Sequence, residues 1–399
     1  MNNSASLTLP ENPAPIRFDR NELAGAFGDI GTDLPLIIGM ILAAKLDVAS
    51  VLILYGAMQI FSGLFYRLPM PVQPLKAVAI MVIAQKASGK IITPEILYGG
   101  GLAIGIFMLL LTLTGLIDWL GRIIPKIVVR GIQLGLGLQL TTLALKDYVP
   151  HDGARGFVLA GVAFVISLLF LQNKKYPAAL FVIFIGLIYA LIFKLNLSTA
   201  TQNVGYSLPQ IHVPEFKNIL AGFILLALPQ VPLSIGNSIL AAKQTAHDLF
   251  PERPQSLRKI SFTYSIMNLV NPFFGGIPTC HGSGGLAGHY AFGARTGGSV
   301  IIYGTLYLTL GFFFSGGFEN IIQIFPLPIL GVILLFEGIA LMLLIRDAAD
   351  SKINFFLVLL VGLIANGLPY GYLIALMVGT ILVHARARSV RLGELEKQG

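Results

Sequence analysis

The sequence has few charged residues. Only 12% of its 399 residues are Asp, Glu, Lys or Arg, whereas 55% are hydrophobic. About a quarter of the residues in a soluble domain are charged, so this composition excludes an ordinary soluble protein. Apolar runs of the roughly 17 to 25 residues that cross a bilayer recur along the chain. They predict an all-α polytopic membrane protein rather than a β-barrel.

Cysteine is almost absent as well. Cys280 is the only one, so no internal disulfide can form. Residues 1–20 contain no apolar stretch of the kind found in signal peptides, and no cleavable signal is expected. The net charge is +8, but the basic residues are spread over short loops between apolar segments. This distribution is typical of membrane topology signals and argues against a nucleic-acid partner.

Apolar windows bounded by glycine, proline or charge predict 14 transmembrane segments. Their expected ranges are 21–44, 48–66, 69–86, 94–117, 124–145, 156–172, 176–194, 217–240, 258–273, 276–294, 298–316, 323–345, 353–368 and 369–386. The predicted organisation is a cytoplasmic tail at 1–20, a first repeat at 21–194, a linker at 195–216, a second repeat at 217–386 and a cytoplasmic tail at 387–399.

The distribution of basic residues predicts the orientation. With a cytoplasmic N-terminus, 18 of the 27 Lys and Arg residues fall on the inner side and 7 on the outer side, and Lys76 and Arg130 lie within or near segments. The excess of positive charge inside supports an even number of spans, with both termini in the cytoplasm of a cell (inner) membrane protein.

The two halves resemble each other in three places. LPLIIGMILAAK at 34–45 resembles VPLSIGNSILAAK at 231–243, and YRLPMPVQP at 66–74 has the position of FGGIPTCHG at 274–282. IPKIVVRGIQLGLGL at 124–138 corresponds to FPLPILGVILLFEGI at 325–339. Because seven spans reverse the direction of the chain, a duplicated half is inverted in the membrane, and we expect a 7+7 inverted repeat.

The third and tenth segments cannot be regular helices throughout. MPVQP at 70–74 contains two prolines, and FFGGIPTCHGSGG at 273–285 is rich in glycine and proline. We expect half-helices beginning near Leu75 and Ser283, each preceded by extended backbone and with their N-termini facing each other at the membrane midplane.

Two helix N-termini that meet form an anion site, because free N–H groups and two partial charges of about +0.5 converge there. With Lys76 the local charge is about +2, which matches a dianion. The predicted substrate-binding residues lie in these two segments and in the eighth: Gln73, Pro74, Leu75, Lys76, Thr279, Cys280, His281, Gly282, Ser283, Gly284, Gly285, Gln230 and Asn237.

Each of these features has a plainer interpretation. Glycine and proline breaks also permit close helix packing, and the polar residues of the eighth segment also form interhelical hydrogen bonds. Cys280 and His281 suggest a thiol nucleophile or a metal pair, but adjacent residues do not face one another on a helix. We therefore predict no enzyme activity, no metal site and no cofactor.

The first segment contains three acids. Asp29 and Asp33 are four residues apart, on one helical face, and Glu22 precedes them. One interpretation places them near the inner boundary, capping neighbouring helix ends. The other has Asp29 or Asp33 pairing with Lys76 or carrying a coupling proton, with Glu337 as a further candidate.

Three motifs resemble those of the molybdate transporter family, which is related to the sulfate permeases. They are GAFGDIGTDLPL at 25–36, PMPVQPLKA at 69–77 and PTCHGSGGLAGHYAFGARTGG at 278–298. The resemblance implies uptake of molybdate, and possibly of sulfate, through a fold shared with sulfate permeases and nucleobase symporters. It also implies a core domain of segments one to four and eight to eleven, a gate domain of the other segments, and elevator-like transport. The 13 residues at 387–399 are too few for the cytoplasmic regulatory domain that sulfate permeases carry.

The expected partners are therefore molybdate or sulfate, protons, the lipid bilayer and possibly a second copy of the chain. The alternatives to a proton-coupled carrier are a nucleobase-type proton symporter and a passive anion channel, both on the same fold.

Overall fold

The computed structural model describes residues 15–87, 92–170, 178–193, 205–316, 325–368 and 370–395. The proton-coupling candidate Glu337 lies in a helix, but its side chain is outside the described part of the chain. Residues 1–14 of the predicted N-terminal tail, 195–204 of the predicted linker and 396–399 of the C-terminal tail also lie outside it.

The described chain is mainly helical. Its first half contains α1 (Arg20–Ala26), α2 (Ile30–Ala44), α3 (Val48–Tyr66), α4 (Lys76–Ala87), α5 (Pro94–Leu113), α6 (Leu116–Ile123), α7 (Lys126–Leu143), α8 (Gly153–Leu169) and α9 (Ala178–Phe193). Its second half contains α11 (Phe216–Gly222), α12 (Leu228–Leu233), α13 (Ala241–Leu249), α14 (Leu257–Val270), α15 (Ser283–Ala291), α16 (Gly298–Phe313), α18 (Leu327–Leu343), α19 (Lys352–Gly367) and α20 (Gly371–Leu395). Short π-helical stretches are η1 (Ala144–Tyr148), η2 (Phe223–Ala227) and η3 (Ser234–Leu240), and short 3-10 stretches are η4 (Asn271–Phe274) and η5 (Leu344–Ala348).

Several helices are long and apolar enough to cross a membrane. They are Val48–Tyr66, Pro94–Leu113, Lys126–Tyr148, Phe216–Leu249 and Leu327–Ala348. Shorter apolar helices of 10 to 17 residues accompany them, such as Gly153–Leu169 and Gly298–Phe313. The predicted class, a helical protein with several apolar spans, is confirmed.

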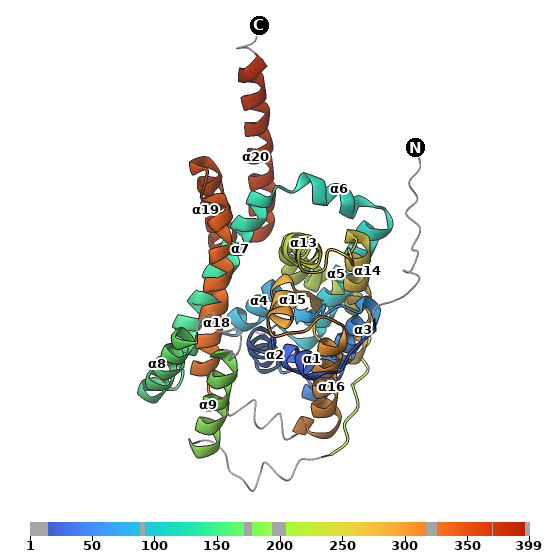
Figure 1. Cartoon of the computed structure of the whole chain (residues 1–399), viewed down its shortest axis with the longest axis vertical. Helices are drawn as coiled ribbons and strands as arrows, with labels where there is room; N and C mark the ends of the chain where they lie inside the picture. Colours follow the sequence, from blue (N-terminus) through green and yellow to red (C-terminus); the bar gives the residue numbers. More distant parts are fainter. Residues whose placement is uncertain are drawn as a thin grey trace.

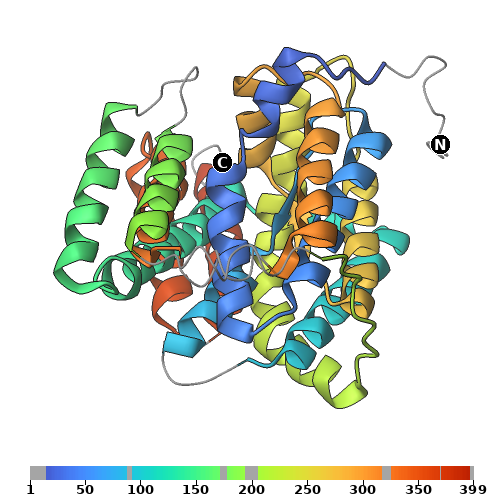
Figure 2. The same ribbon diagram turned by 90° about the horizontal axis from the view of Figure 1, so that it is seen from below.

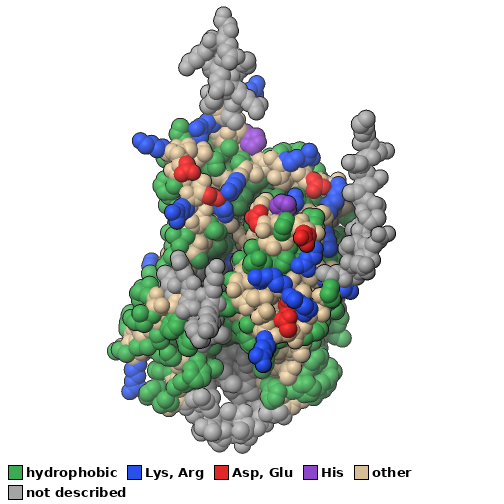
Figure 3. Space-filling model, in the orientation of Figure 1, with side chains coloured by type: hydrophobic (Ala, Val, Ile, Leu, Met, Phe, Trp, Pro, Cys, Tyr) green, Lys and Arg blue, Asp and Glu red, His purple; other side chains and the backbone are tan. Residues whose placement is uncertain are grey.

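The helices form two groups that lie side by side (Figures 1 and 2). One contains α7, α8, α9, α18, α19 and α20, and the other contains α1 to α5 and α13 to α16. Charged side chains gather on the face turned to the viewer over α1 and α13, while hydrophobic ones cover the flank formed by α8 and α9 (Figure 3). An apolar flank next to a charged face is the pattern of a protein whose sides contact lipid.

Several predicted boundaries differ from the structure. The segment expected at 21–44 is two helices, because the chain turns between Ala26 and Ile30, and Asp29 is the N-cap residue of α2 rather than an interior one. The segment expected to end at 240 continues to Leu249. The polar sequence KQTAHDL at 243–249 stays helical, although it was not expected within the span. The separate helix α6 was not expected either, and α20 continues to Leu395, into the predicted tail.

The breaks in the third and tenth segments occur where proline and glycine predict them. Helix α4 begins at Lys76 and α15 at Ser283, and each follows three residues of strand. The two strands, β1 (Val72–Pro74) and β2 (Thr279–His281), pair antiparallel, with Gln73 opposite Cys280. Because antiparallel strands run in opposite directions, the two half-helices leave this ribbon in opposite directions. The pairing itself was not predicted.

Glycines let helices pack closely around the ribbon. A Cβ atom on Gly56 of α3 would lie 2.5 Å from the backbone oxygen of Gly304 of α16, and the reverse substitution gives the same distance. A Cβ on Gly28 would lie 2.5 Å from the carbonyl carbon of Gly288 in α15. Close backbone approach of this kind is typical of helix pairs in membranes.

Candidate functional site

The outer edges of the β1–β2 ribbon are closed by amide side chains. Gln59 of α3 accepts a hydrogen bond from Val72 N at 3.0 Å and donates one to Val72 O at 2.7 Å. Asn268 of α14 does the same for Thr279, accepting from its backbone N at 3.0 Å and donating to its O at 2.6 Å. Extended backbone buried inside a membrane protein must find such partners. The same solution therefore occurs once in each half of the chain.

The N-terminus of α4 is capped by a residue of the second half. Gln230 of α12 accepts hydrogen bonds from Ala77 N at 3.0 Å and Val78 N at 3.3 Å through its side-chain oxygen. Its amide nitrogen donates to Ser234 at 3.2 Å. Thus Gln230 is at the predicted site, but its oxygen takes the place on α4 that a bound anion was expected to occupy.

The N-terminus of α15 is different. Gly282 is its N-cap residue, and the described part of the chain provides no side-chain cap. Ser283 is half-buried, and Gly284 is exposed, with no atom within 4 Å of a Cβ built on it. This end of the ribbon therefore has backbone N–H groups at an open position, which favours an anion.

Two close contacts occur on the buried side of the N-terminus of α15. A Cβ on Gly282 would lie 1.7 Å from the side-chain oxygen of Gln73, and a Cβ on Gly285 would lie 2.1 Å from Asp29 Oδ2. Gln73 donates to both carboxylate oxygens of Asp29 at 2.7 Å. The glycines thus allow a buried carboxylate to approach the start of α15.

The second acid, Asp33, is fully buried in α2. Tyr55 of α3 donates a hydrogen bond to Asp33 Oδ2, and the Tyr55 hydroxyl also lies 2.6 Å from Val72 O. Lys76 is 7% exposed and lies close enough to Asp33 to interact with its charge. The structure therefore brings Asp29, Asp33 and Lys76 together around the ribbon, as the sequence suggested.

Glu22 has a capping role. Its carboxylate accepts hydrogen bonds from the backbone nitrogens of Arg295 and Thr296 at 2.9 Å and of Ser299 at 3.0 Å. It thereby caps the start of α16. The capping interpretation of the acids is thus the one that fits Glu22.

The side chains of β2 are engaged inside the protein. His281 Nδ1 lies 3.1 Å from Pro71 O, which can only accept, so Nδ1 carries the proton and Nε2 accepts from Thr263 Oγ1 at 2.8 Å. Asn271 donates to Thr279 Oγ1 at 3.2 Å. Cys280 is buried, with its sulfur 4.0 Å from Pro74 O. In the described part of the chain, no group of three or more His, Cys, Asp and Glu residues could hold a metal ion.

Asn237, predicted as a substrate-binding residue, instead contacts the other group of helices. Its side-chain oxygen accepts from Gln133 of α7 at 2.9 Å. Gln133 in turn accepts from Arg130 at 2.9 Å, and Arg130 forms an ion pair of 2.7 Å with Asp347 of η5. These four residues, the Asn237–Asp347 bridge, connect the two groups of helices.

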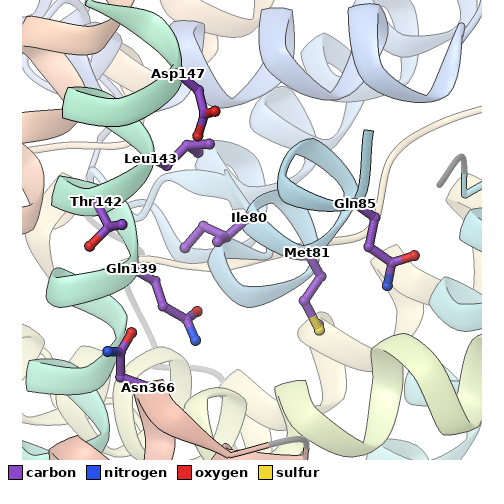
Figure 4. Close-up of a pocket in the computed structure, with 8 residues that line it drawn as sticks. All are labelled: Ile80, Met81, Gln85, Gln139, Thr142, Leu143, Asp147 and Asn366. Carbon is purple, nitrogen blue, oxygen red and sulfur yellow. The ribbon is translucent and has the colours of Figure 1, made fainter. Parts of the chain in front are cut away.

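A cavity of about 350 Å³ lies between the same two groups (Figure 4). Helix α4 contributes Ile80, Met81 and Gln85 to its lining, and α7 and η1 contribute Gln139, Thr142, Leu143 and Asp147, together with Asn366 of α19. Asp147 is the only charged residue among them, so the cavity does not favour a dianion. It begins one turn beyond the N-terminus of α4 and shows that the two groups are not tightly packed along their whole length.

Four residues of this site were missed in the sequence: Tyr55, Gln59, Gln133 and Asn268. Each is a polar residue buried within a helix. Buried polar groups in membrane helices usually find partners, and this signal was available for the three amides.

Comparisons with known proteins identify the family of this chain. The family model described as "Molybdate transporter of MFS superfamily" matches residues 21–140 and 222–341. The chain belongs to the molybdate transporter family. Molybdate transporter 1 of Arabidopsis thaliana is 34% identical over 371 residues, which cover 82% of this chain and 80% of that protein. The motif-based prediction of the family is confirmed.

More distant similarity reaches other transporters. The uracil permease of Bacillus subtilis (strain 168) is 25% identical over 380 residues, covering 88% of this chain and 84% of the permease. The structure of the murine Slc26a9 anion transporter in the inward-facing state has a TM-score of 0.71 at 12% identity, over 95% of this chain and 70% of that one. This chain therefore has the fold of a membrane transporter.

Proposed function

We propose that this protein imports molybdate, and sulfate as a second substrate, by binding the dianion at the N-terminus of α15, with the charge of Lys76 at the start of α4 attracting it. The observation that carries the proposal is the open N-terminus of α15, together with the buried Lys76 at the start of the paired half-helix α4. Thr279, Cys280 and His281 shape the ribbon, while Ser283, Gly284 and Gly285 supply N–H groups and the Ser283 hydroxyl supplies a further donor. Pro74 and Leu75 position Lys76 at the start of α4.

Uptake of labelled molybdate into proteoliposomes under an imposed pH gradient tests this function. We expect Lys76→Ala and Ser283→Ala to reduce uptake by about tenfold or more, since hydrogen bonds to a charged group contribute about 1.5 to 3 kcal/mol. Matched controls are Lys352→Ala, at an exposed position of α19, and Ser167→Ala in α8, whose hydroxyl bonds only within its own helix. The absence of uptake of any oxyanion by the unmodified protein would refute the proposal.

We further propose that the chain is a 7+7 inverted repeat divided into core and gate. The family model matches two stretches of equal length whose starts are 201 residues apart. The paired contacts of Gln59 with Val72 and Asn268 with Thr279 support the same symmetry. The group containing α1 to α5 and α13 to α16 is then the core, and elevator-like transport moves it against the gate. The predicted repeat boundaries, 21–194 and 217–386, remain part of this proposal.

Proton coupling is proposed from the position of Asp29. Its carboxylate lies against Gly285, at the N-terminus where the dianion would bind. Like charges repel in a buried site, so a proton on Asp29 or Asp33 favours substrate binding. Glu337 remains a further candidate. The proposed setting is the cell membrane, with both termini cytoplasmic and a second copy of the chain as a partner.

Three other functions predict different results. A nucleobase symporter, suggested by the relation to a uracil permease, would take up uracil or lose molybdate uptake in competition with it. A passive channel would carry currents well above carrier rates. An enzyme that used Cys280 would be inactivated by Cys280→Ser, whereas we expect that variant to transport normally because the thiol is buried against the ribbon.

A further inference from the structure

The Tyr55 hydroxyl has one proton and two acceptors. One acceptor is Asp33 Oδ2, and the other is Val72 O at 2.6 Å. An O–H group donates its proton to one acceptor at a time in a well-formed hydrogen bond. Tyr55 must therefore favour either the carboxyl group or the strand.

The choice depends on the charge of Asp33. Asp33 and Tyr55 are 0% and 1% exposed, so no bulk water competes for the hydroxyl. Within the described chain, Asp33 Oδ1 is a buried oxygen without a hydrogen-bond partner. The Tyr55 hydroxyl is thus the donor on which an ionised Asp33 depends.

Other titratable groups surround Asp33 on every side. They are Asp29 before α2, Lys76 of α4, Tyr303 and Tyr307 of α16, and Cys280 of β2. Of these, Asp29 already accepts from Gln73, and Tyr303 and Tyr307 hydrogen-bond to each other at 3.0 Å. Among the described residues, Tyr55 connects Asp33 directly to a backbone oxygen of β1.

Val72 is the first residue of β1 and precedes Gln73, the partner of Asp29. Val72 O also accepts from Gln59 at 2.7 Å, so it has a second donor when Tyr55 turns toward Asp33. A change in the hydrogen bonds that Val72 O accepts therefore acts on the strand that leads into α4 and Lys76.

We propose that Tyr55 is a positioning residue that transmits the protonation state of Asp33 to β1 and so to the anion site. This inference rests on the proposed proton-coupled function. When Asp33 is ionised, Tyr55 donates to Oδ2, and Val72 O keeps Gln59 as its donor. When Asp33 gains a proton from the aqueous phase, its carboxylic O–H donates to the Tyr55 oxygen, and the Tyr55 proton turns to Val72 O. Tyr55 stays neutral throughout, and the one proton gained by Asp33 is the one carried.

The first test is Tyr55→Phe, which removes only the hydroxyl. The matched control is Tyr307→Phe, another buried tyrosine, whose ring packs edge-on against Tyr55 at 4.9 Å but whose hydroxyl bonds to Tyr303.

Initial uptake of molybdate is measured across a pH series. Exchange of labelled for unlabelled molybdate at equal pH on both sides is measured in the same proteoliposomes. We expect Tyr55→Phe to shift the pH midpoint of uptake by about one unit, a tenfold change in proton concentration. We also expect it to lower the ratio of net uptake to exchange by about tenfold, with the control unchanged.

A second variant keeps the test decisive if Tyr55→Phe does not fold. Asp33→Asn carries an amide that donates to Tyr55 as a protonated carboxyl does. We expect it to retain exchange while losing the pH dependence of uptake. Adding Tyr55→Phe to Asp33→Asn should change the pH profile no further, because both act on one pair.

The outcomes separate this inference from the proposed function. Suppose that the unmodified protein transports molybdate with protons, and that Tyr55→Phe has the same pH profile and the same ratio of uptake to exchange as the unmodified protein. The role of Tyr55 is then refuted, and the proposed function stands. If Asp33→Asn keeps the normal pH dependence, the inference also fails. If no variant, including the unmodified protein, shows pH-dependent uptake, the proposed coupling fails first.

Discussion

The side-chain oxygen of Gln230 lies 3.0 Å from the backbone nitrogen of Ala77. A residue of the second half of the chain thus caps the half-helix of the first half. The cap is a neutral amide, so it satisfies the N–H groups of α4 without cancelling the charge of Lys76. This choice of a neutral acceptor fits a site that binds a dianion.

Gln230→Glu should retain the fold and abolish uptake. A carboxylate accepts from Ala77 and Val78 as the amide does, but it places a negative charge at the proposed site. Like charges a few Å apart repel by several kcal/mol at protein dielectric values, so we expect the affinity for molybdate to fall at least about a hundredfold. Binding of labelled molybdate to the purified protein measures this.

Two variants separate charge from capping. Gln230→Leu removes the cap without adding charge and should weaken binding less than Gln230→Glu does. Gln244→Glu adds the same charge at an exposed position of α13 and should have little effect. Equal losses in the leucine and glutamate variants would contradict the electrostatic explanation.

Gly284→Ala should weaken binding without destabilising the protein. Its new Cβ would meet no atom within 4 Å, so the methyl group would stand in the open space before α15. We expect about a tenfold rise in the dissociation constant for molybdate, because the anion could no longer approach the N–H groups closely. Gly161→Ala in α8, also without neighbours within 4 Å, is the matched control. Unchanged binding in Gly284→Ala would remove α15 from the site.

Gly285→Ala, in contrast, should fail to fold, since its Cβ would lie 2.1 Å from Asp29 Oδ2.

Asn268→Leu should destabilise the protein more than Gln59→Leu. The asparagine satisfies both the N–H and the C=O of Thr279, and Pro74, opposite Thr279, has no N–H to replace it. Val72 O, in contrast, can accept from the Tyr55 hydroxyl when Gln59 is lost. Since each buried unsatisfied group costs about 1 to 3 kcal/mol, we expect losses of about 2 to 6 kcal/mol for Asn268→Leu and about 1 to 3 kcal/mol for Gln59→Leu. Denaturant unfolding in detergent, with Ser167→Ala as control, measures the difference; a reversed order would count against this account of the ribbon.

The breaks at β1 and β2 could be predicted because proline and glycine act locally. Pro71 and Pro74 each lack a backbone N–H and so disfavour a helix before Lys76, although Pro229 and Pro232, at the same spacing, lie within α12. The pairing of the strands could not be predicted in this way, since it joins residues 207 positions apart, such as Gln73 and Cys280. The extension of the eighth span to Leu249 was missed because polarity marks the membrane boundary and not the end of a helix.

Among the site residues, too, local features could be predicted from the sequence and long-range contacts could not. Lys76 and Ser283 were predicted from residue type and distance to a break, and Asp29 because an acid inside an apolar segment is costly. The different roles of Gln230 and Asn237 could not be predicted, because both are amides in one apolar helix and only their neighbours distinguish them. Tyr55 gave no signal, since tyrosine is common in membrane helices.

The Asn237–Asp347 bridge gives a final prediction about movement. Gln133 is 1% exposed and joins Asn237 to Arg130, so this contact must break if the two groups of helices slide past each other. Gln133→Leu should therefore destabilise the arrangement described here and shift the population away from it.

The change in population is measured by labelling a cysteine placed by Ala287→Cys, at an exposed position of α15, in a Cys280→Ser background. We expect Gln133→Leu to slow labelling of this cysteine by a polar maleimide about threefold to tenfold, since one buried hydrogen bond contributes about 0.5 to 1.5 kcal/mol. Gln244→Leu, exposed on α13, should leave labelling unchanged. Equal labelling rates with and without Gln133 would mean that the bridge does not hold the two groups together.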